Sequence, residues 1–397
     1  MKRMSAVPAP SVSIPYGRQD ISEADIAAVV EVLHSDWLTQ GPAVPRFEQL
    51  LAARTGARHA VAVNSATSAL QLVYRALGIG PGSRVWTSPN TFVATASAAA
   101  LLGAEVDFID IDPRTLNLCP QRLEERLEAA GRDGTLPDLL VPVHFAGRSC
   151  DMAAIGALAK RYGFRVVEDA AHALGAEADG VPVGACRHSD AVVLSFHPVK
   201  IVTTGEGGAV LCQDDALATR LQELRSHGIT RDPARMPAEP DGAWQYDQLE
   251  LGWNFRMTDL QAALGASQLG RLDAFLARRR ALAVRYEALL AALALQRPQR
   301  DARMRSAWHL YVVQLADAPL RRRVFDALRA AGIGVNVHYR PVYLQPWWRA
   351  RGFAPGHCPE AERYYAGALS LPLHPRLSES EQNHVVLQLG EALAGLS

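Results

Sequence analysis

SFHPVKIVTTGEGG, residues 195–208, is the most informative stretch of this chain. It places Lys200 a few residues after a short apolar segment, 191–195, that has the composition of a buried strand. The glycines that follow permit a ligand to approach the backbone closely. A lysine in a shielded site can reach the neutral amine form that attacks an aldehyde, because burial lowers its pKa from about 10.4. Taken alone, the stretch fits a solvated lysine in a glycine-rich turn at least as well.

Short apolar segments alternate with helical segments on both sides of this stretch. The expected strands are 59–63, 84–87, 106–111, 139–144, 165–168, 191–195 and 209–212, and helices such as 69–77, 92–102 and 152–162 fit between them. This alternation predicts an α/β fold with a mostly parallel sheet that is covered on both faces. Ligands of such sheets bind at the carboxyl ends of the strands, so the residues that follow each strand are the candidates for a site.

The remaining parts of the chain follow other patterns. Residues 21–35 and 44–54 have helical spacing, and 229–248 is rich in proline and charge, as expected of a long exposed loop. Residues 257–290 form a long helical stretch with room for a kink. The expected later elements are strands at 307–315 and 335–338 and helices at 321–331, 360–369 and 378–393. We therefore expect a large domain, 14–271, and a smaller C-terminal α/β domain, 272–397.

The segment VVEDAAHALGA, residues 166–176, places Asp169 at the end of an expected strand. A carboxylate at this position can pair with the ring nitrogen of pyridoxal and keep it protonated, which makes the ring an electron sink. Asp169 would serve equally well as the N-cap of a helix. His172 either packs beside such a cofactor or binds a backbone carbonyl, and for a single histidine the second role is the more common.

The segment NSATSAL, residues 64–70, brings hydroxyl residues to a strand–helix junction. Backbone N–H groups at a helix N-terminus form a natural phosphate cradle, and Ser195 is a plausible second donor. Simple capping by Ser65 or Thr67 would also explain the pattern. Phe92 is placed either to cover the face of a cofactor ring or to pack in the core.

Two further segments carry polar groups, LGWNFRM (251–257) and NVHYRPV (336–342). Arg256 in the first suits phosphate recognition. His338, Tyr339 and Arg340 in the second lie at an expected strand end. An ordinary strand exit and a surface ion pair would account for both segments as well.

Composition argues against several classes of protein. The 397 residues carry 41 basic and 41 acidic side chains, whereas nucleic-acid binding usually needs a basic surplus. The apolar stretch 94–104 is too short to span a bilayer, and Lys2 and Arg3 precede the proline-rich segment 6–10 instead of an apolar signal. The five cysteines are scattered without a CxxC pair, so neither a disulfide framework nor a metal site is expected. We expect a cytoplasmic protein without nucleic-acid or membrane partners.

Together these segments resemble one known family, the DegT/DnrJ/StrS-type nucleotide-sugar aminotransferases. The resemblance runs from about residue 14 to the C-terminus. The segments that carry it are WLTQGP (37–42), NSATSAL, SPNTFVAT (88–95), VEDAAHALGA, SFHPVK, TTGEGG, NFRM and VHY. The family implies the aspartate-aminotransferase fold (PLP fold type I), with a mostly parallel seven-stranded sheet in the large domain, and pyridoxal 5′-phosphate (PLP) as cofactor.

The resemblance also implies roles for individual residues. Lys200 would hold PLP covalently, Asp169 would pair with the pyridine nitrogen, Phe92 would cover the ring face and His172 would lie near the ring hydroxyl. The phosphate would be held by Ala66, Thr67, Ser68 and Ser195. Family members are homodimers with shared active sites, and Asn254 would reach across to the partner's cofactor.

Within the family, HPVK followed by TTGEGG is most similar to the transaminase of pseudaminic acid biosynthesis. That enzyme uses a UDP-linked 4-keto-6-deoxy-N-acetylhexosamine, which it aminates at C4 with L-glutamate as donor. The residues that match its substrate contacts are Tyr16, Leu38, Thr39, Gln40, Gly41, Ala66, Ser195, Asn254, Asn336, Val337, His338 and Tyr339. Ile201 departs from the subfamily, which has proline there, and this weakens the substrate assignment.

Three alternatives to this predicted function can be distinguished from it. Another nucleotide 3-keto or 4-keto sugar would use the same machinery. PLP-dependent sugar dehydratases of this fold carry histidine where this chain has Lys200. A PLP-binding sensor would usually carry an additional DNA-binding or partner domain, for which the length and the neutral charge leave no obvious place.

Overall fold

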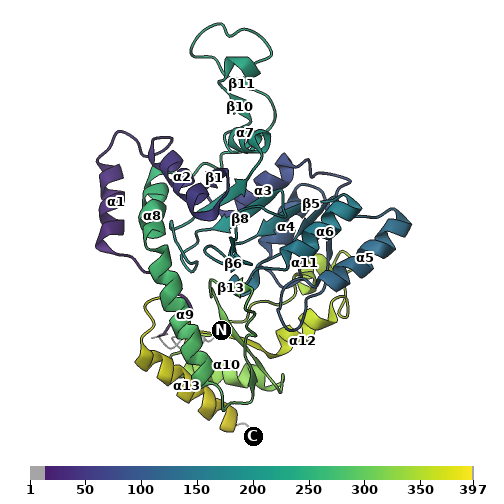
Figure 1. Cartoon of the computed structure of the whole chain (residues 1–397), viewed down its shortest axis with the longest axis vertical. Coiled ribbons are helices and arrows are strands. Elements are labelled where there is room, and N and C mark those ends of the chain that lie inside the picture. Colours follow the sequence, from purple (N-terminus) through teal and green to yellow (C-terminus); the bar gives the residue numbers. More distant parts are fainter. Residues whose placement is uncertain (1–13, 396–397) are drawn as a thin grey trace, which may run out of the picture.

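A seven-stranded sheet forms the centre of the chain (Figure 1). The computed structural model describes residues 14–395, so the proline-rich segment 6–10 lies outside the described residues. The strand order is β1-β9-β8-β5-β4-β2-β3, and all neighbours are parallel except that β9 runs antiparallel to both β1 and β8. The strands are β1 His59–Val63, β2 Arg84–Thr87, β3 Glu105–Phe108, β4 Leu139–Val141, β5 Arg165–Asp169, β8 Ala191–Ser195 and β9 Gly208–Cys212. The expected mostly parallel seven-stranded sheet is confirmed.

Helices cover both faces of this sheet because alternate strand residues point to opposite sides. Val61 and Val63 of β1 pack under α3, α4 and α7, while Ala60 and Ala62 pack under α2 and α8. Further along the sheet, α5 and α6 cover the second face. The helices are α2 Ala43–Thr55, α3 Ala66–Ala76, α4 Ala94–Leu101, α5 Pro120–Asp133, α6 Met152–Tyr162, α7 Asp215–Leu224 and α8 Asp259–Gly270.

The C-terminal part contains a smaller antiparallel sheet of order β12-β14-β15. Its strands are β12 Leu295–Gln296, β14 Tyr311–Leu315 and β15 Ala368–Leu371. One apolar cluster joins this sheet to α9 Leu272–Leu289, α10 Leu320–Ala330 and α13 Glu379–Ala394, and α12 Pro359–Gly367 belongs to another. The long helical stretch expected at 257–290 breaks at Arg271, between α8 and α9. The domain boundary placed at Leu272 stays a prediction.

Two expected strands of the C-terminal part are wrong, one in its extent and one altogether. The strand expected at 307–315 begins only at Tyr311, because Trp308 has a φ of 51° and the amides of His309 and Leu310 bind the carbonyl of Ala146 instead of a strand. The segment 335–338 is not a strand. It makes one bridge, between Asn336 and Ser370.

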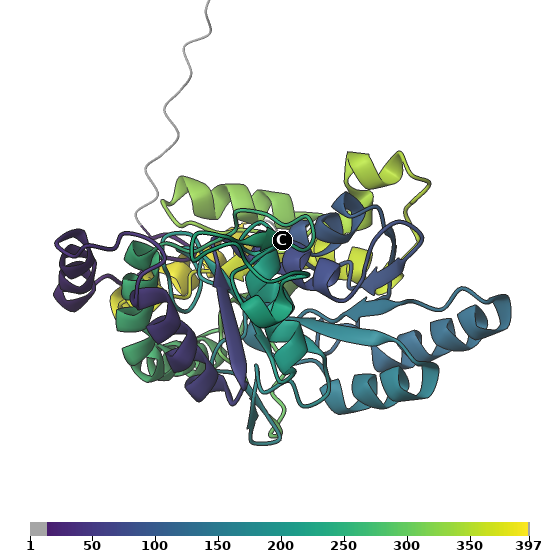
Figure 2. The same ribbon diagram turned by 90° about the horizontal axis from the view of Figure 1, so that it is seen from above.

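Two segments protrude from the body. The stretch 229–248 follows α7 as a long arm whose base is closed by β10 Ile229–Thr230 and β11 Asp247–Gln248 (Figure 1). Helix α1, Glu23–Leu33, lies at the edge of the molecule when it is seen from above (Figure 2). None of the helices between residues 14 and 395 is long and apolar enough to cross a bilayer.

Candidate active site

Lys200 and Asp169 lie at the same edge of the central sheet. Asp169 ends β5, which pairs with β8 in parallel register, and Lys200 lies in the turn that follows β8. The side chain of Lys200 is partly buried. Burial lowers the pKa of Lys200 to about 8, although the negative charge of Asp169 acts in the opposite direction. A substantial fraction of this amine is therefore neutral near physiological pH, as a nucleophile and proton carrier requires.

Asp169 is buried and held by two hydrogen bonds. Thr95 Oγ1 donates to its Oδ2 at 2.7 Å, and the backbone N–H of Ala171 donates to its Oδ1 at 3.1 Å. Residues 171–172 and 174–175 form turns, so no helix follows Asp169 and the N-cap interpretation is wrong. A carboxylate accepts about four hydrogen bonds, which leaves Asp169 able to receive one from a protonated ring nitrogen.

His172 is a neutral side chain whose tautomer follows from its neighbours. Its Nδ1 accepts the backbone N–H of Ala146 at 3.3 Å, so its proton resides on Nε2, which lies 3.3 Å from Tyr339 Oη. Burial lowers the pKa of His172 well below its ordinary value, and the nearby charge of Lys200 adds to the effect. Since this imidazole accepts from an amide, the reading in which it binds a backbone carbonyl is wrong.

The first turn of α3 offers unpaired amides at the same sheet edge. Ser65 is the N-cap and accepts the N–H of Ser68 at 3.1 Å. Within the described chain, the N–H groups of Ala66 and Thr67 have no hydrogen-bond partner, as is usual for the first helical positions. Capping by Ser65 and binding of an anion by the next two amides are therefore compatible.

Gly208 brings the start of α3 close to β9. A Cβ at this position would lie 2.6 Å from the Ala66 nitrogen, so any other residue would push the two backbones apart. Gly208 pairs with Ser195 across the sheet, which places Ser195 beside the same helix start. The four residues expected to hold a phosphate therefore converge.

Phe92 does not belong to the core. It is 59% exposed, and its ring centroid lies 6.5 Å from that of Tyr339. The core-packing alternative for Phe92 is wrong, and the ring is free to cover a planar ligand. The amine of Lys200, the carboxylate of Asp169, the amides of α3 and this aromatic ring match the aldehyde, ring nitrogen, phosphate and planar ring of PLP.

The residues expected to bind the sugar form a second group that contacts the first. Tyr16 is hydrogen-bonded to Asn336, and its ring lies 5.4 Å from that of His338. His338 Nδ1 lies 2.7 Å from Ser370 Oγ, and burial lowers the pKa of His338 to about 3. The amide of Val337 binds Asn336 Oδ1, so Val337 offers a side chain but no free N–H.

Tyr339 connects the two groups. Its backbone N–H donates to Asn90 Oδ1 at 3.2 Å, while its hydroxyl lies 3.3 Å from His172 Nε2. Because His172 Nε2 carries the proton, the hydroxyl of Tyr339 accepts from it and keeps its own hydrogen available for a ligand. Burial raises the pKa of Tyr339, so this hydroxyl remains protonated.

A third set of expected site residues comprises Leu38, Thr39, Gln40, Gly41 and Asn254. The first three and Asn254 are exposed, and within residues 14–395 no hydrogen bond or ring contact joins any of the five to Lys200, Asp169 or His172. Asp259 fixes the loop, since its carboxylate accepts the N–H of Gly41 and its own N–H binds the carbonyl of Leu38.

Three functional candidates were missed by reasoning from sequence alone, namely Thr95, Arg279 and His309. Thr95 lies within SPNTFVAT, so the segment was noticed but not this side chain. The ring of His309 packs on His172 with centroids 4.3 Å apart. Arg279 is buried and donates to the carbonyls of Trp308, His309 and Leu373. No local pattern distinguishes Arg279 or His309 from core residues, because both act through contacts distant in sequence.

Comparison with known proteins identifies the family. The profile of the DegT/DnrJ/EryC1/StrS aminotransferase family matches residues 19–390. The chain is 39% identical over 388 residues to the spore coat polysaccharide biosynthesis protein SpsC of Bacillus subtilis (strain 168), with 96% of this chain and 97% of that protein covered. The chain belongs to this family.

Solved structures agree with this assignment. The putative sugar aminotransferase Spr1654 of Streptococcus pneumoniae, in its PMP form, superposes with a TM-score of 0.88 at 30% identity, covering 97% of this chain and 100% of that chain. Helicobacter pylori PseC, an aminotransferase involved in the biosynthesis of pseudoaminic acid, gives a TM-score of 0.88 at 28% identity, covering 96% and 99%. The protein is a sugar aminotransferase of PLP fold type I with PLP as its cofactor.

Proposed function

We propose that this sugar aminotransferase moves the amino group of L-glutamate to C4 of a UDP-linked 4-keto-6-deoxy-N-acetylhexosamine. The products would be 2-oxoglutarate and UDP-4-amino-4,6-dideoxy-N-acetyl-β-L-altrosamine. The observation that carries the chemistry is the partly buried Lys200, with a pKa of about 8, beside the fixed carboxylate of Asp169. The substrate rests on the HPVK and TTGEGG segments and on the similarity to H. pylori PseC.

The side chains around Lys200 have separate tasks in this proposal. Bound PLP supplies an electron sink for the negative charge that develops at the reacting carbon. Lys200 Nζ, as a neutral amine, takes the proton from the α-carbon of glutamate and later returns a proton to C4 of the sugar. Asp169 holds the proton on the ring nitrogen, and Thr95 fixes the orientation of that carboxylate.

The remaining residues bind and orient. The free amides of Ala66 and Thr67, with Ser68 and Ser195, hold the phosphate, and Phe92 covers the ring face. Neutral His172 lies at the ring hydroxyl. The sugar-binding region is lined by Tyr16, Asn336, Val337, His338 and the hydroxyl of Tyr339.

A second substrate class has its own support. The match to SpsC, named for spore coat polysaccharide biosynthesis, is stronger in identity than the match to PseC. Ile201 also departs from the subfamily pattern, in which a proline follows the lysine. Another nucleotide 3-keto or 4-keto sugar is therefore the alternative substrate.

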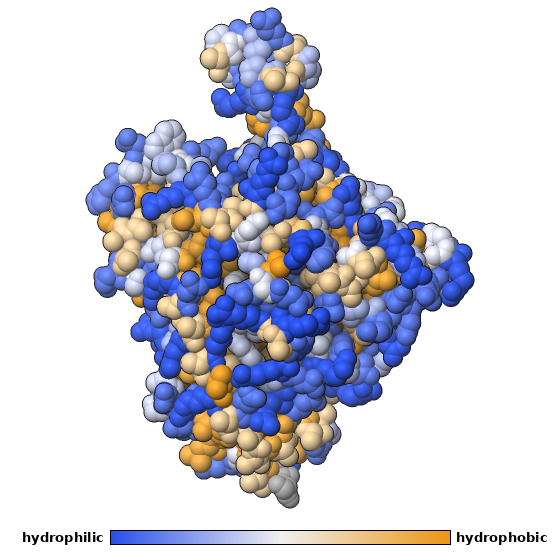
Figure 3. All heavy atoms as spheres, in the orientation of Figure 1, coloured by the Kyte–Doolittle hydropathy of each residue, from blue (hydrophilic) through white to orange (hydrophobic). Residues whose placement is uncertain are grey.

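We further propose that the enzyme is a homodimer with shared active sites. Helix α1 buries an acidic residue and exposes its apolar ones. Its buried residue is Asp25, while Ile26, Val30 and Leu33 are 42–55% exposed. Asp25 is bound by Gln268 and Arg271, so this orientation of α1 is fixed. Apolar residues gather on the side of the molecule where α1 and α8 lie (Figure 3).

A partner subunit on this side would cover these apolar residues and bring exposed groups to the cofactor. The loop after α1 contains Leu38, Thr39, Gln40 and Gly41. Asn254 lies in the segment that returns from the long arm. In this arrangement Asn254 of one subunit completes the active site of the other. We also propose a cytoplasmic location, in keeping with five cysteines that are all free thiols.

The absorbance spectrum of the purified, PLP-loaded protein tests the reaction class and donor. L-glutamate should shift the visible band of the bound cofactor to shorter wavelength and release 2-oxoglutarate. A panel of UDP- and dTDP-linked 3-keto and 4-keto sugars should then restore the original band, with the UDP 4-keto-N-acetylhexosamine fastest and its product identified by NMR. A visible band that no amount of glutamate changes would refute glutamate as the donor.

Mixing two inactive variants tests the shared site. Lys200→Ala and Asn254→Ala subunits should each have little activity alone. Hybrid dimers contain one intact site, so an equal mixture should recover about a quarter of wild-type turnover after subunit exchange. No recovery in a mixture shown by mass spectrometry to contain hybrids would contradict an Asn254 that acts across the interface.

A further inference from the structure

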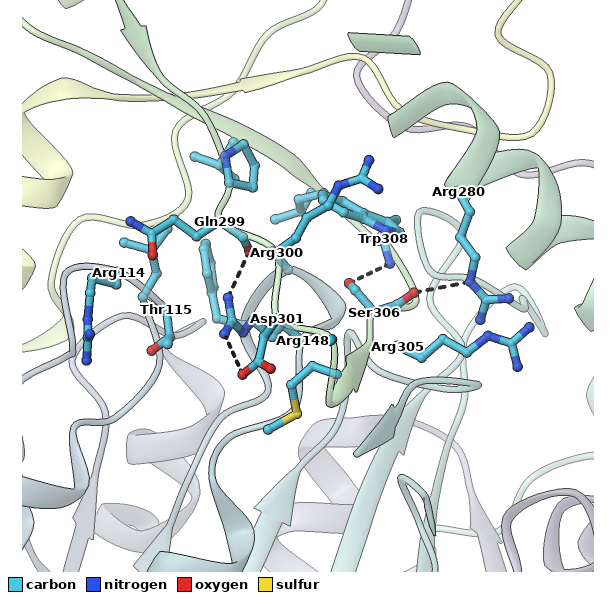
Figure 4. A pocket seen from close by; sticks show the side chains of 18 of the residues that line it. Arg114, Thr115, Arg148, Arg280, Gln299, Arg300, Asp301, Arg305, Ser306 and Trp308 are labelled. Atoms are coloured by element: carbon cyan, nitrogen blue, oxygen red, sulfur yellow. Dashed lines mark hydrogen bonds and ion pairs between the residues drawn. The ribbon is translucent and has the colours of Figure 1, made fainter. Parts of the chain in front are cut away.

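A second cavity, rich in arginine, lies behind the active site. It has a volume of about 700 Å³ and is bordered by α9, by residues 114–116 and 145–148, and by the segment 298–308. Neither Lys200 nor Asp169 lines it. Five arginines do, together with one carboxylate, Asp301, and their side chains are shown in Figure 4. These arginines are Arg114, Arg148, Arg280, Arg300 and Arg305.

Among residues 14–395, four of these five guanidinium groups have a carboxylate partner within 4 Å, and Arg280 does not. The pairs are Arg114–Asp112, Arg148–Asp301, Arg300–Glu287 and Arg305–Glu177. Within the described chain, the one hydrogen bond of Arg280 is a long one, from Nε to the carbonyl of Ser306 at 3.5 Å. Arg280 is therefore a partly buried cation whose donors are largely unused.

The surroundings of Arg280 lower its pKa. Burial lowers the pKa of Arg280, and the like charge of Arg305 lowers it further, while Glu177 and Asp273 oppose this effect from a distance. Figure 4 shows Arg280 and Arg305 on the same side of the cavity, with Ser306 and Trp308 beside them. Two guanidinium groups on one wall form a geometry that an oxyanion satisfies, because each can donate two parallel hydrogen bonds to it.

We propose that this cavity binds a phosphorylated small molecule whose phosphate lies between Arg280 and Arg305. A phosphate carries more charge than a carboxylate and has enough oxygens for both guanidinium groups. The rest of the ligand would lie over the apolar lining, where Val284, Pro298 and Trp308 are found. The volume is within the usual range of small-molecule sites.

The wall of this cavity is connected directly to the active-site histidine. Trp308 lines the cavity, and the next residue, His309, packs on His172. Ala146 also lines the cavity, while its N–H binds His172 and its carbonyl accepts the N–H of His309 at 3.0 Å. A ligand that moves Trp308 or Ala146 therefore acts directly on the histidine of the active site, so the cavity is placed to serve as an effector site.

Isothermal titration calorimetry on the PLP-loaded wild-type protein tests the proposal, with inorganic pyrophosphate as the first probe and UDP as the second. Arg280→Ala should weaken pyrophosphate binding by at least about tenfold, the loss expected for one charge-assisted contact. Arg322→Ala is the matched control, because it removes an arginine from α10 whose side chain is 90% exposed and should leave binding unchanged. UDP should bind to two classes of site, of which Arg280→Ala removes one.

The result that overturns the proposal is equally direct. Absence of saturable pyrophosphate and UDP binding to this cavity, or equal affinities in wild type, Arg280→Ala and the Arg280→Ala/Arg305→Ala double variant, would reject it. The heat of binding is measured without turnover, so this outcome is independent of the proposed transamination. Conversely, Arg280→Ala should keep the glutamate-induced change in the spectrum, which shows that the variant is folded and loaded with PLP.

Discussion

Burial affects the protonation of basic side chains differently on the two sides of the wall formed by residues 145–147 and 308–310. On the active-site side, burial lowers the pKa of Lys200 to about 8 and that of His338 to about 3, and it keeps His172 neutral. On the other side, burial also lowers the pKa of Arg148 and Arg280, yet a guanidinium remains protonated at any physiological pH. The same desolvation therefore yields proton carriers on one side and anion-binding groups on the other.

Helix α9 illustrates this difference with two consecutive residues. Arg279 points inward, where it donates to the three carbonyls of Trp308, His309 and Leu373, and burial lowers its pKa to about 10. Arg280, about 100° further around the helix, lines the arginine-rich cavity. Arg279 thus fixes the wall, and Arg280 leaves its donors to whatever occupies the cavity. The predictions below test the first side of this comparison, since the calorimetry above tests the second.

The largest effect is expected from Lys200→Ala. Removing the amine removes both the attachment point of the cofactor and the proton carrier, so turnover should fall by at least about 10³-fold. Lys160→Ala on the exposed face of α6 is the matched control and should retain wild-type turnover. Steady-state rates with glutamate and a keto sugar measure this, and appreciable turnover by Lys200→Ala would refute the assignment of the lysine.

A smaller loss is expected from Asp169→Asn. The amide keeps the shape of the carboxylate but cannot hold a proton on the ring nitrogen by charge, so kcat should fall by about 10²- to 10³-fold. The melting temperature should change little, because an asparagine oxygen still accepts the N–H of Ala171. Near-normal kcat together with a large loss of stability would show that Asp169 has only a structural role.

The central sheet was predictable because its signals are local. His59–Val63, Arg84–Thr87 and Ala191–Ser195 are short apolar runs with turn residues after them, and all three are strands with the expected bounds. The segment 307–310 was not predictable. Its residues look like a strand, but the carbonyl of Ala146, far away in the sequence, binds the amide of His309 and draws the segment out of the sheet.

The candidate site divides in the same way. Lys200, Asp169 and the start of α3 follow strands directly, so the topology alone brings them to one edge. The cavity lined by Arg280 combines α9 with loops from several parts of the chain, and no spacing in the sequence predicts that these segments lie together. The loop 38–41 and Asn254 matched the family pattern, but a single chain does not join them to Lys200.

A still smaller effect is expected from Thr95→Val. This change removes the hydrogen bond from Thr95 Oγ1 to Asp169 and frees the carboxylate to turn, which should lower kcat about tenfold while KM for glutamate changes little. Thr87→Val is the control, because Thr87 is also buried but donates to the carbonyl of Val141. It should cost stability and spare kcat. Equal effects of the two variants on kcat would mean that Thr95 does not act through Asp169.

The smallest expected effect is a displacement along the pH axis. Only the neutral amine of Lys200 can attach PLP, so the attachment rate of the cofactor-free protein should rise with pH and level off above about 8, the lowered pKa of Lys200. His338, with a pKa of about 3, and His172, whose pKa is also far below this range, stay neutral throughout and add no step of their own. Asp169 raises the pKa of Lys200, so Asp169→Asn should move the midpoint to lower pH.

Stopped-flow absorbance after PLP addition measures the rate, and the same reaction with a free amine such as N-acetyl-lysine corrects for titration of PLP itself. A midpoint near 10, the value of an exposed lysine, would remove the contrast between the two sides of the wall, because burial would then have left Lys200 as firmly charged as the arginines behind it.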